Sequence, residues 1–579
     1  LRSEKSGVFS FINLLIPNRK LKLADVIILA SIMVLLYFGV SLIMGDHTLR
    51  SENGVKINLD NSELPIYTFF SVLRMLAAYF LSCIFSLTYG KYAAKNKKAE
   101  KIMLPILDIL QSVPILSFLP VVVLSLRVVF PQGIAAEIGS VILIFTSQAW
   151  NMTFSWYQSL TTIPKDLNEA AKIFRLNSWK RFKTLEFPFG VISFIWNSMM
   201  SWAGGWFFLM AAEIFTVGDK DFRLPGLGSY LQEAANQNNF SAIFTGLATL
   251  VLIIIILDQL VWRPLLAWSD KFKLEMTESD NPPTSWFYDA LQEARLTNFF
   301  TDNIIKPFWN IIDRLLAKSS TDTTEVVKEK GIGKFIGKIV KFAFYLTLLY
   351  GLYKILMMLG SLTFTELSKI GLGVMATLLR VAVALAIAFC WTVVVGVAIA
   401  TNKKFAAFMQ PIIQILASIP ATALFPVILI FIIKLPNGIN IAAVLLMLLG
   451  TQWYLLFNII AGASSIPQEL KYTSKLLQFN TYRRWKILIL PAIFPYIITG
   501  AIAASGGAWN ASIVSEYVNF GGKTLQTIGI GSLIADSTAK GNYPLLLAST
   551  LAMIIAVVAI NRLVWRRLYA IAEEKYKMD

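Results

Sequence analysis

Cysteine and histidine are almost absent from this chain of 579 residues, which contains two cysteines and one histidine. Cys83 and Cys390 each lie within an apolar run, so we expect neither a disulfide framework nor a thiolate metal site. His47 is the lone histidine, which excludes a multi-histidine metal site and gives no basis for histidine acid-base catalysis. The sequence therefore predicts no enzyme active site, no metal site and no cofactor bound by this chain.

Charged residues are also scarce. They make up 15% of the chain, whereas hydrophobic residues make up 56%, and the mean hydropathy is +0.62. Such a composition is too apolar for an ordinary soluble protein, and several apolar runs reach the roughly 20 residues that a bilayer-crossing helix needs. The sequence therefore predicts an all-α polytopic membrane protein.

The positive charges gather in alternate loops. Lys and Arg cluster in residues 2–22, 91–101 and 165–183, whereas the loop 46–63 has few cations. By the positive-inside rule, this alternation predicts that both termini are cytoplasmic. The formal net charge of +17 is therefore interpreted as membrane topology and contact with lipid, with no nucleic acid as partner.

One short segment imitates the end of a phosphate-binding loop. It reads Gly521-Gly522-Lys523-Thr524, but the motif requires a glycine five residues before its second glycine, and Tyr517 stands there. We therefore expect a turn beyond a helix end, and no ATP site in this chain.

The two halves of the chain repeat one pattern. Near the start of each half, matching residues lie 306 residues apart, as Pro114 and Pro420 do. After the next loop the separation becomes 303, as for Trp206 and Trp509. A register kept over such a length predicts duplication of a unit of about 230 residues. With six spans in each unit, the two repeats would run parallel across the membrane.

We expect about twelve membrane-crossing helices in total. The apolar runs predict them near residues 24–45, 66–90, 103–126, 134–157, 190–217 and 241–262, and again near 338–360, 372–400, 407–434, 438–461, 493–517 and 544–564. The predicted domains are a first repeat at 1–264, a cytoplasmic linker at 265–337 and a second repeat at 338–579. An amphipathic helix is expected in the linker around residues 286–316.

A long loop follows the fourth span of each half. We call these the first inner loop (residues 164–188) and the second inner loop (residues 467–491). The first begins with Pro164 and has an acid in the next turn and small residues beyond it, a pattern that predicts a short helix able to pack into a groove. Each loop is thus a candidate docking element.

The first inner loop resembles the signature of the binding-protein-dependent permease family of ABC importers. That signature is Glu-Ala-Ala, three residues, Gly, then about nine residues and Ile-x-Leu-Pro. Glu169-Ala170-Ala171 and Pro188 match it, and Arg175 stands where Gly is usual. In the second inner loop, Tyr472-Thr473-Ser474 replaces Glu-Ala-Ala and Gln478 replaces Gly, while the prolines remain.

A finer pattern is similar to the nitrate/sulfonate/taurine/bicarbonate branch of this family. It consists of Ser71 and Arg74 in a Ser-x-x-Arg sequence, a third span rich in proline, and Gly226-Leu227-Gly228. The resemblance implies a type I ABC importer-like permease fold in a bacterial cytoplasmic (inner) membrane. It also implies a fused pseudo-dimer that forms a path for a small solute, such as a nitrate, sulfonate or bicarbonate anion.

The resemblance further implies partners. These are two ATP-binding cassette ATPase subunits, which would bind ATP and Mg²⁺, and an extracytoplasmic substrate-binding protein. In the family the inner loop forms the helix that couples to the ATPase. The residues implied in that coupling are Pro164, Glu169, Ala170, Ala171, Arg175, Pro188, Pro467, Lys471, Tyr472, Thr473, Ser474, Gln478 and Pro491.

Polar groups within the spans are candidates for the translocation path. Arg74 and Arg380 occupy equivalent places, so pseudo-symmetry could set two guanidinium groups around one path, which would suit an anion; snorkelling to lipid headgroups is the alternative. Glu213 and Glu516 end the fifth spans, where a gate and a helix-end hydrogen bond are both reasonable roles. The predicted path residues are Arg74, Arg380, Trp206, Glu213, Trp509, Asn510, Ser512 and Glu516.

The rival interpretation is an ion-coupled carrier, because two parallel halves of six spans with a long middle loop also describe such a protein. A carrier of that kind is not expected to have a long, proline-bounded inner loop between the fourth and fifth spans of both halves. This chain has both loops, which favours the ATP-driven permease.

Overall fold

The computed structural model describes residues 50–51, 54–112, 114–217, 220–272, 284–294, 301–318, 346, 349–464, 466, 468–521 and 523–576. They are predominantly helical, which confirms the predicted all-α class. The chain divides into two compact units. One contains Thr162–Ile195 and Ile256–Thr324, and the other contains Thr48–Thr161, Trp196–Ile255 and Glu325–Asp579.

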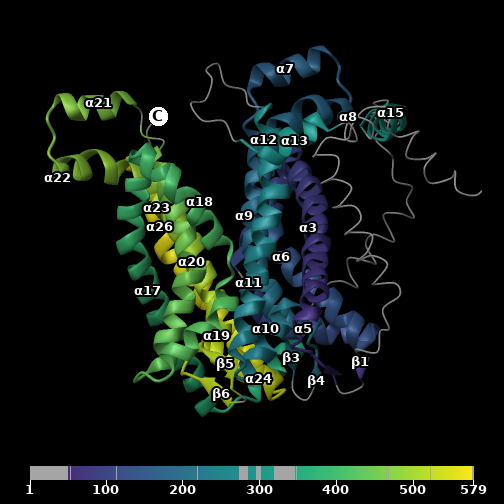
Figure 1. Cartoon of the computed structure of the whole chain (residues 1–579), viewed down its shortest axis with the longest axis vertical. Coiled ribbons are helices and arrows are strands. Elements are labelled where there is room, and N and C mark those ends of the chain that lie inside the picture. Colours follow the sequence, from purple (N-terminus) through teal and green to yellow (C-terminus); the bar gives the residue numbers. More distant parts are fainter. Residues whose placement is uncertain are drawn as a thin grey trace, which may run out of the picture. The chain divides into compact units, whose positions relative to one another are not determined.

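The helices follow one another in the same order in both halves (Figure 1). The first half contains α3 (Leu64–Lys95), α4 (Lys97–Ser112), α5 (Ile115–Val129), α6 (Gln132–Thr161), α7 (Lys165–Ile173), α8 (Ser178–Arg181), α9 (Phe187–Glu213), α10 (Leu227–Asn236), α11 (Phe240–Leu257) and α12 (Arg263–Asp270). The second contains α17 (Phe364–Thr401), α18 (Lys403–Ser418), α19 (Ala421–Ile432), α20 (Gly438–Ser464), α21 (Gln468–Leu476), α22 (Thr481–Arg484), α23 (Leu490–Ser515), α24 (Ile530–Ala539), α25 (Tyr543–Ile560) and α26 (Arg566–Tyr576). The duplication predicted from residue spacing is therefore a duplication of structure.

Short π-helical turns also recur at matching places. They are η2 (Phe182–Glu186) before α9, η5 (Trp485–Ile489) before α23, η3 (Asp258–Trp262) before α12 and η6 (Asn561–Trp565) before α26. A single 3-10 turn, η1 (Asn61–Glu63), precedes α3.

Within the described residues, seven helices are long and apolar enough to cross a membrane, or eight if the bent pair α18 and α19 forms one span. The span predicted at 24–45 lies outside these residues, and only part of 338–360 is described, as the apolar helix Leu349–Gly360. The total of about twelve spans stays a prediction.

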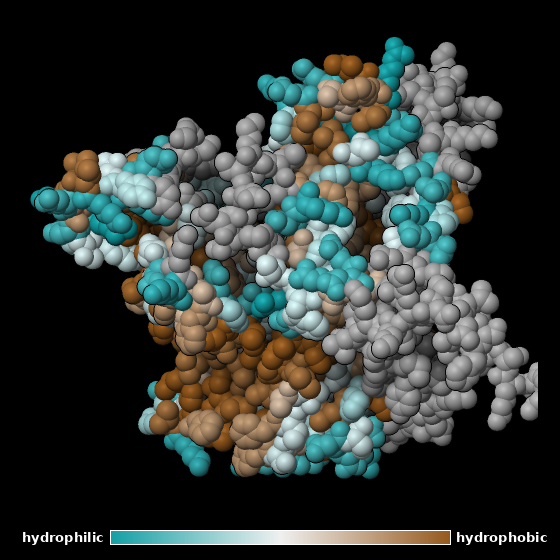
Figure 2. All heavy atoms as spheres, turned by 45° about the horizontal axis from the view of Figure 1, so that its top comes forward, coloured by the Kyte–Doolittle hydropathy of each residue, from teal (hydrophilic) through white to brown (hydrophobic). Residues whose placement is uncertain are grey.

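One face of the long helices is apolar and uncovered. Leu372, Met375 and Leu379 of α17 are each more than 60% exposed, whereas Gly373 and Thr377 on the opposite face are buried. A spacing of three and four residues places the exposed set on one stripe. Apolar side chains form a continuous area between zones of polar side chains on the face in Figure 2, as a bilayer-facing surface requires.

The third predicted span is broken in each half. We expected continuous helices over 103–126 and 407–434, but α4 and α5 are separate helices, and α18 and α19 are bent by 87° at their junction. Pro114 and Pro420 precede α5 and α19 with extended backbone. Proline lacks an N–H and disfavours a helical conformation in the residue before it, so the helix stops there. The expectation of continuous helices was wrong.

Glycine allows close packing at the same place in each repeat. α3 packs along α6, and α17 packs along α20. A Cβ atom at Gly90 would lie 2.9 Å from Cδ1 of Trp156, and one at Gly396 would lie 2.8 Å from Cγ2 of Ile459. Both separations are below van der Waals contact, so a larger residue would push these helices apart.

A two-stranded antiparallel ribbon follows the fifth long helix of each half. After α9 it is formed by β3 (Thr216–Val217) and β4 (Lys220–Asp221), and after α23 by β5 (Tyr517–Phe520) and β6 (Lys523–Gln526). A third ribbon pairs β1 (Arg50–Ser51) with β2 (Gly54–Val55). The β5–β6 ribbon occupies the segment that imitates a phosphate-binding loop. Since α21 and α22 precede α23, this ribbon and the second inner loop lie at opposite ends of that helix (Figure 1).

The linker contains more than the single helix we expected over 286–316. α13 (Trp286–Glu293) ends at Ala294, whose ψ of 131° is extended. The chain is helical again in η4 (Thr301–Ile305) and α15 (Lys306–Lys318). The helix expected across this region is therefore interrupted at Ala294.

Candidate functional site

A buried ion pair joins three helices in the first half. Glu213 ends α9 and is fully buried; its Oε1 lies 2.8 Å from Nη1 of Arg74 in α3 and accepts a hydrogen bond of 2.7 Å from the hydroxyl of Ser71. Nε and Nη2 of Arg74 also donate to the two carboxylate oxygens of Glu137 in α6, at 2.7 and 2.8 Å. We call Ser71, Arg74, Glu137 and Glu213 the first hub.

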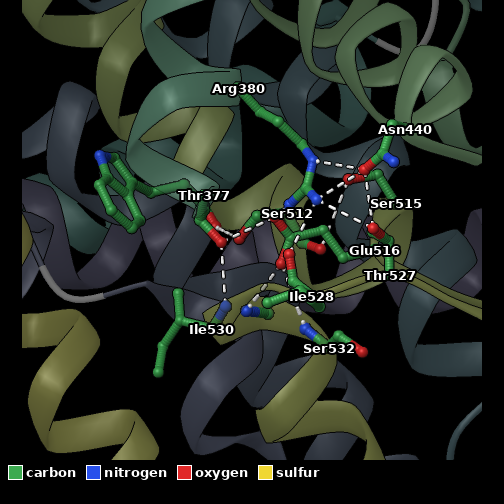
Figure 3. A network of polar contacts seen from close by, with 12 residues as sticks. Thr377, Arg380, Asn440, Ser512, Ser515, Glu516, Thr527, Ile528, Ile530 and Ser532 are labelled. Carbon is green, nitrogen blue, oxygen red and sulfur yellow. Dashed lines mark hydrogen bonds and ion pairs between the residues drawn. The ribbon is translucent and has the colours of Figure 1, made fainter. Parts of the chain in front are cut away.

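The second half builds the same arrangement (Figure 3). Glu516, directly after α23, is fully buried; its Oε1 lies 2.7 Å from Nη1 of Arg380 and accepts a hydrogen bond of 2.7 Å from the hydroxyl of Thr377. Nη2 of Arg380 donates to Oδ1 of Asn440 in α20 at 2.7 Å and to the hydroxyl of Thr527 at 2.9 Å. We call Thr377, Arg380, Asn440 and Glu516 the second hub.

Each buried glutamate also fixes the start of a short helix beyond the ribbon. The N–H of Gly228 donates to Oε2 of Glu213 at 2.7 Å, and the N–H of Gly531 donates to Oε2 of Glu516 at 3.0 Å. A Cβ atom at Gly226 or at Gly529 would overlap the same carboxylates. The Gly-x-Gly sequence is thus required because the backbone approaches a buried carboxylate too closely for any side chain.

The two hubs differ in charge. Glu137 of the first hub corresponds to Asn440 of the second, so Arg74 faces two carboxylates whereas Arg380 faces one. The side chains of Arg74 and Arg380 are 4% and 11% exposed, so neither extends outward to a lipid headgroup. A buried charge without hydrogen-bond or ionic partners would be very costly. This cost explains why each arginine is held by several hydrogen bonds.

The other predicted path residues lie in the same part of the fold. Trp206 and Trp509 are each 1% exposed, and Ser512 is buried with its hydroxyl donating to the backbone carbonyl of Trp509. Oδ1 of Asn510 accepts a hydrogen bond of 2.6 Å from the N–H of Ile115, the first residue of α5. Asn510 therefore satisfies a backbone group at the break between α4 and α5. The substrate-path role of all eight residues stays a prediction.

Sequence reasoning missed Thr377, Asn440 and Glu137 as hub residues. The repeat could have indicated the first, because a hydroxyl residue stands three positions before each arginine, as Ser71 does before Arg74. No local pattern indicates Glu137 or Asn440, since each comes from a separate helix.

The first inner loop begins with the predicted short helix. Pro164 is extended and precedes α7, and Asp166 lies in the first turn. Glu169 is exposed, Ala170 is partly buried and Ala171 is 6% exposed. Pro188 is the second residue of α9 and directly follows the π-helical turn η2.

The second inner loop has the same layout with different side chains. Tyr472 and Thr473 are exposed on α21, and Ser474 is 4% exposed, at the place of Ala171. Pro491 is the second residue of α23. Pro467 lies outside the described residues. The predicted coupling roles in both loops stay predictions.

Each short helix ends on a residue with left-handed backbone. Arg175 has a φ of 47° and Gln478 a φ of 50°, and both stand where the family signature has glycine. In the first loop, the N–H of Leu176 donates to the carbonyl of Ala171 at 3.1 Å, and the N–H of Arg175 donates to that of Lys172 at 2.9 Å. This is the Schellman ending, which normally selects glycine because a Cβ atom is strained there. The conformation of the signature is therefore kept without its glycine.

The linker contacts the first inner loop directly. Nε1 of Trp179 donates to Oδ1 of Asp313 in α15 at 2.8 Å, and Lys183 forms an ion pair with the same carboxylate. The rings of Trp179 and Trp309 stack with centroids 6.4 Å apart. The hydrogen bond from Lys183, and then that from Trp179, hold the pKa of Asp313 below its usual value. No pattern in the sequence indicated this contact.

Both inner loops expose an apolar pair at the end of the short helix. Ile173 and Phe174 are 78% and 76% exposed, and Leu476 and Leu477, at the equivalent places, are 86% and 59% exposed. Two adjacent large apolar side chains in an otherwise polar loop are typical of a surface that another molecule covers.

Residues 86–261 and 392–577 each match the family described as the binding-protein-dependent transport system inner membrane component. These two stretches make up more than half of the chain, with one in each repeat. The chain belongs to this permease family. The family expected from the inner loops is thereby confirmed, and its members are transport subunits.

The permease is similar to several curated proteins. It is 26% identical to the nitrate import permease protein NrtB of Synechococcus elongatus over 172 residues, 30% of this chain and 58% of the relative. It is 31% identical to the bicarbonate transport system permease protein CmpB of the same species over 169 residues, 29% of this chain and 57% of the relative. The trimethylamine N-oxide transport system permease protein TmoV of Pelagibacter ubique is 23% identical over 485 residues, 74% of this chain and 61% of the relative. The chain spans less than two thirds of the length of these relatives. Their similarity to the chain confirms the predicted nitrate/sulfonate/taurine/bicarbonate branch.

Removing the cation of the second hub tests its contribution to the permease. Arg380→Met leaves Glu516 buried without a counter-charge, so we expect the free energy of unfolding to fall by about 3–5 kcal/mol. The double variant Arg380→Met/Glu516→Gln leaves no buried charge and is expected to recover part of that loss. Thermal unfolding of the purified permease in detergent measures both, and equal destabilisation by the single and double variants would contradict the ion-pair interpretation.

Restoring the glycine of the family signature tests the left-handed residues. Arg175→Gly and Gln478→Gly each relieve a strained backbone, so we expect each to stabilise its loop by about 0.5–1 kcal/mol. Arg175→Ala is the matched control, because alanine keeps the Cβ atom and gains nothing. Hydrogen exchange of the loop amides measures the effect, and equal protection in the glycine and alanine variants would refute it.

Proposed function

We propose that this chain is the membrane-spanning permease subunit of an ABC importer, in which two fused halves form the translocation path and separate subunits hydrolyse ATP. The single observation that carries the proposal is the repeated inner loop. In both halves a short helix, a left-handed ending and an exposed apolar pair precede the fifth long helix. Membership of the permease family supports the same function.

Two ATP-binding cassette subunits would cover the two inner loops, one for each repeat. The apolar pairs Ile173–Phe174 and Leu476–Leu477 are candidates for the covered surface. An extracytoplasmic substrate-binding protein would deliver the solute on the other side. The protein would lie in a bacterial cytoplasmic membrane with both termini cytoplasmic.

The second inner loop is continuous with a long helical element. The side chain of Asn480 accepts a hydrogen bond from the N–H of Arg483 at the start of α22, and α22, η5 and α23 then follow without an interruption. α23 has 26 residues, so it is about 39 Å long. Glu516 follows it directly and belongs to the second hub. Movement of the loop would therefore be transmitted to the hub, which supports an alternating-access mechanism.

The proposed substrate is a small solute, with a nitrate, sulfonate or bicarbonate anion as the first candidates. The names of the nitrate and bicarbonate relatives support an anion. Residues near the hubs, Asn510 and Ser512 among them, are proposed to line the path. Arg74 and Arg380 are paired with carboxylates in this structure, so an anion would meet them as part of a hub.

Charged substitutions in the apolar pairs test the docking surface. We expect Ile173→Asp/Phe174→Asp and Leu476→Asp/Leu477→Asp each to reduce the amount of copurified ATPase subunit at least about tenfold, because a carboxylate would be buried in the interface. Ile528→Asp is the control, since Ile528 is 70% exposed but follows the opposite end of α23. Full retention of the ATPase by both double variants, with native unfolding temperatures, would exclude these loops as the docking sites.

The energy source distinguishes the importer from the ion-coupled carrier. We expect proteoliposomes containing the copurified complex and its binding protein to take up labelled nitrate or bicarbonate only when ATP is supplied to the side of the ATPase. An ionophore that dissipates ion gradients is expected to leave this uptake unchanged. Uptake without ATP that the ionophore abolishes would favour the carrier instead.

A further inference from the structure

The two inner loops differ in how their cations are neutralised. In the first, Nε of Arg181 lies 3.1 Å from Oε1 of Glu186, and Nη2 donates to Oδ1 of Asn168 at 2.9 Å. Glu186 is 1% exposed and the side chain of Arg181 is 31% exposed, so the carboxylate is the member of this ion pair that is removed from water. Arg181 is thus braced between α7 and the start of α9 by groups of its own loop.

The equivalent arginine of the second loop has lost both partners. Arg484 stands at the place of Arg181, but Lys471 replaces the asparagine and Ile489 replaces the glutamate. Nε is buried without a hydrogen-bond partner in both arginines, within the described part of the chain, but Nε of Arg181 has the carboxylate of Glu186 beside it, whereas Ile489 offers Arg484 no carboxylate. Burial, and then the charge of Arg484, lower the pKa of Lys471, which agrees with two cations facing each other.

A second pair of equivalent cations shows the same difference between the two loops. Lys183 of the first loop is paired with Asp313 of the linker. Lys486 occupies the equivalent place, and its contact in the described residues is with the ring of Tyr482. Two intrachain carboxylates therefore pair with two cations of the first loop, and their equivalents are missing from the second loop as far as the structure describes it.

We propose that the second inner loop receives its missing carboxylate from the ATPase subunit, as an acidic side chain that binds between Lys471 and Arg484. The inference rests on the proposed function and adds the chemistry of one docking site to it. The repeat itself supports the fit, because Arg181 binds a carboxylate in the equivalent position. Arg484 is half-buried and its Nε is buried without a partner, which is costly, so pairing with a carboxylate across an interface would contribute to affinity.

The docking surface around these cations is mixed. Tyr472 and Leu476 on α21 are 68% and 86% exposed, beside the half-buried Lys471. An interface of this kind combines apolar contact with a desolvated charge pair. The apolar contact contributes affinity, and the charge pair fixes the position of one partner on the other. At the equivalent place the first loop already pairs its arginine with Glu186, so the two ATPase subunits would bind with unequal dependence on salt.

The decisive experiment transfers the internal partners of the first loop to the second. Lys471→Asn/Ile489→Glu gives Arg484 the amide and the carboxylate that Arg181 has. Because the new side chains copy a set already found in this fold, we expect the native unfolding temperature. The affinity for the purified ATPase subunit is expected to fall at least about tenfold, and its decrease with added salt is expected to become shallower.

The reciprocal variant Asn168→Lys/Glu186→Ile is the matched control. This variant leaves cations of the first loop without internal partners. The ATPase subunit is expected to have no acidic side chain that binds at this place in the first loop. Equal affinity and equal salt dependence of the native chain and the Lys471→Asn/Ile489→Glu variant would overturn the inference, while leaving the proposed function intact. If no ATPase subunit binds the native chain, the proposed function fails, and the inference fails with it.

Anionic lipid is the other chemistry that these cations could bind. Reconstitution into vesicles with and without phosphatidylglycerol separates the two sources of negative charge. If the Lys471→Asn/Ile489→Glu variant loses its dependence on phosphatidylglycerol while binding the ATPase subunit as the native chain does, the site belongs to the lipid headgroup and the inference is overturned.

Discussion

A carboxylate removed from water needs a cation beside it, and each half of this permease places such a pair at the end of its fifth long helix. Glu213 and Arg74 form it in the first half, and Glu516 and Arg380 in the second. Each pair joins the end of one long helix to the middle of another and to the short helix beyond the ribbon. The arrangement of that end of the permease therefore depends on two ion pairs.

The hubs also limit how the long helices can move. α23 carries the second inner loop at one end and is followed by Glu516 at the other, so a displacement along its axis would strain the bonds to Arg380 and Gly531. Hydrogen bonds between buried charged groups do not lengthen gradually, because a lengthened bond leaves a buried charge without compensation. Motion is expected either to carry the whole hub as a body or to exchange one bonded arrangement for another.

Much of this fold could be predicted from the sequence because the residue spacing is the same in both copies, which locates long helices and inner loops even where local patterns are weak. The breaks in the third spans could not be placed, since Pro105 lies within α4 whereas Pro114 begins a new helix. The presence of a proline therefore does not by itself locate the break, because Pro105 stays within a helix whereas Pro114 and Pro420 have extended backbone. Glu137 and Asn440 could not be predicted as hub residues from a local pattern. Each lies on a helix other than the two that contribute the arginine and the glutamate of its hub.

The copies differ least where both members of a charge pair are buried. The arginine and glutamate of the hubs are the same in both halves, since each compensates the buried charge of the other. Glu137, with 37% of its side chain exposed, has become Asn440. The inner loops differ more, as Asn168 has become Lys471, although the left-handed backbone at their ends is kept in both. The left-handed ending is held by hydrogen bonds of the loop's own backbone, so it is compatible with different side chains, and the charges of the two loops can differ while their backbone shape is the same.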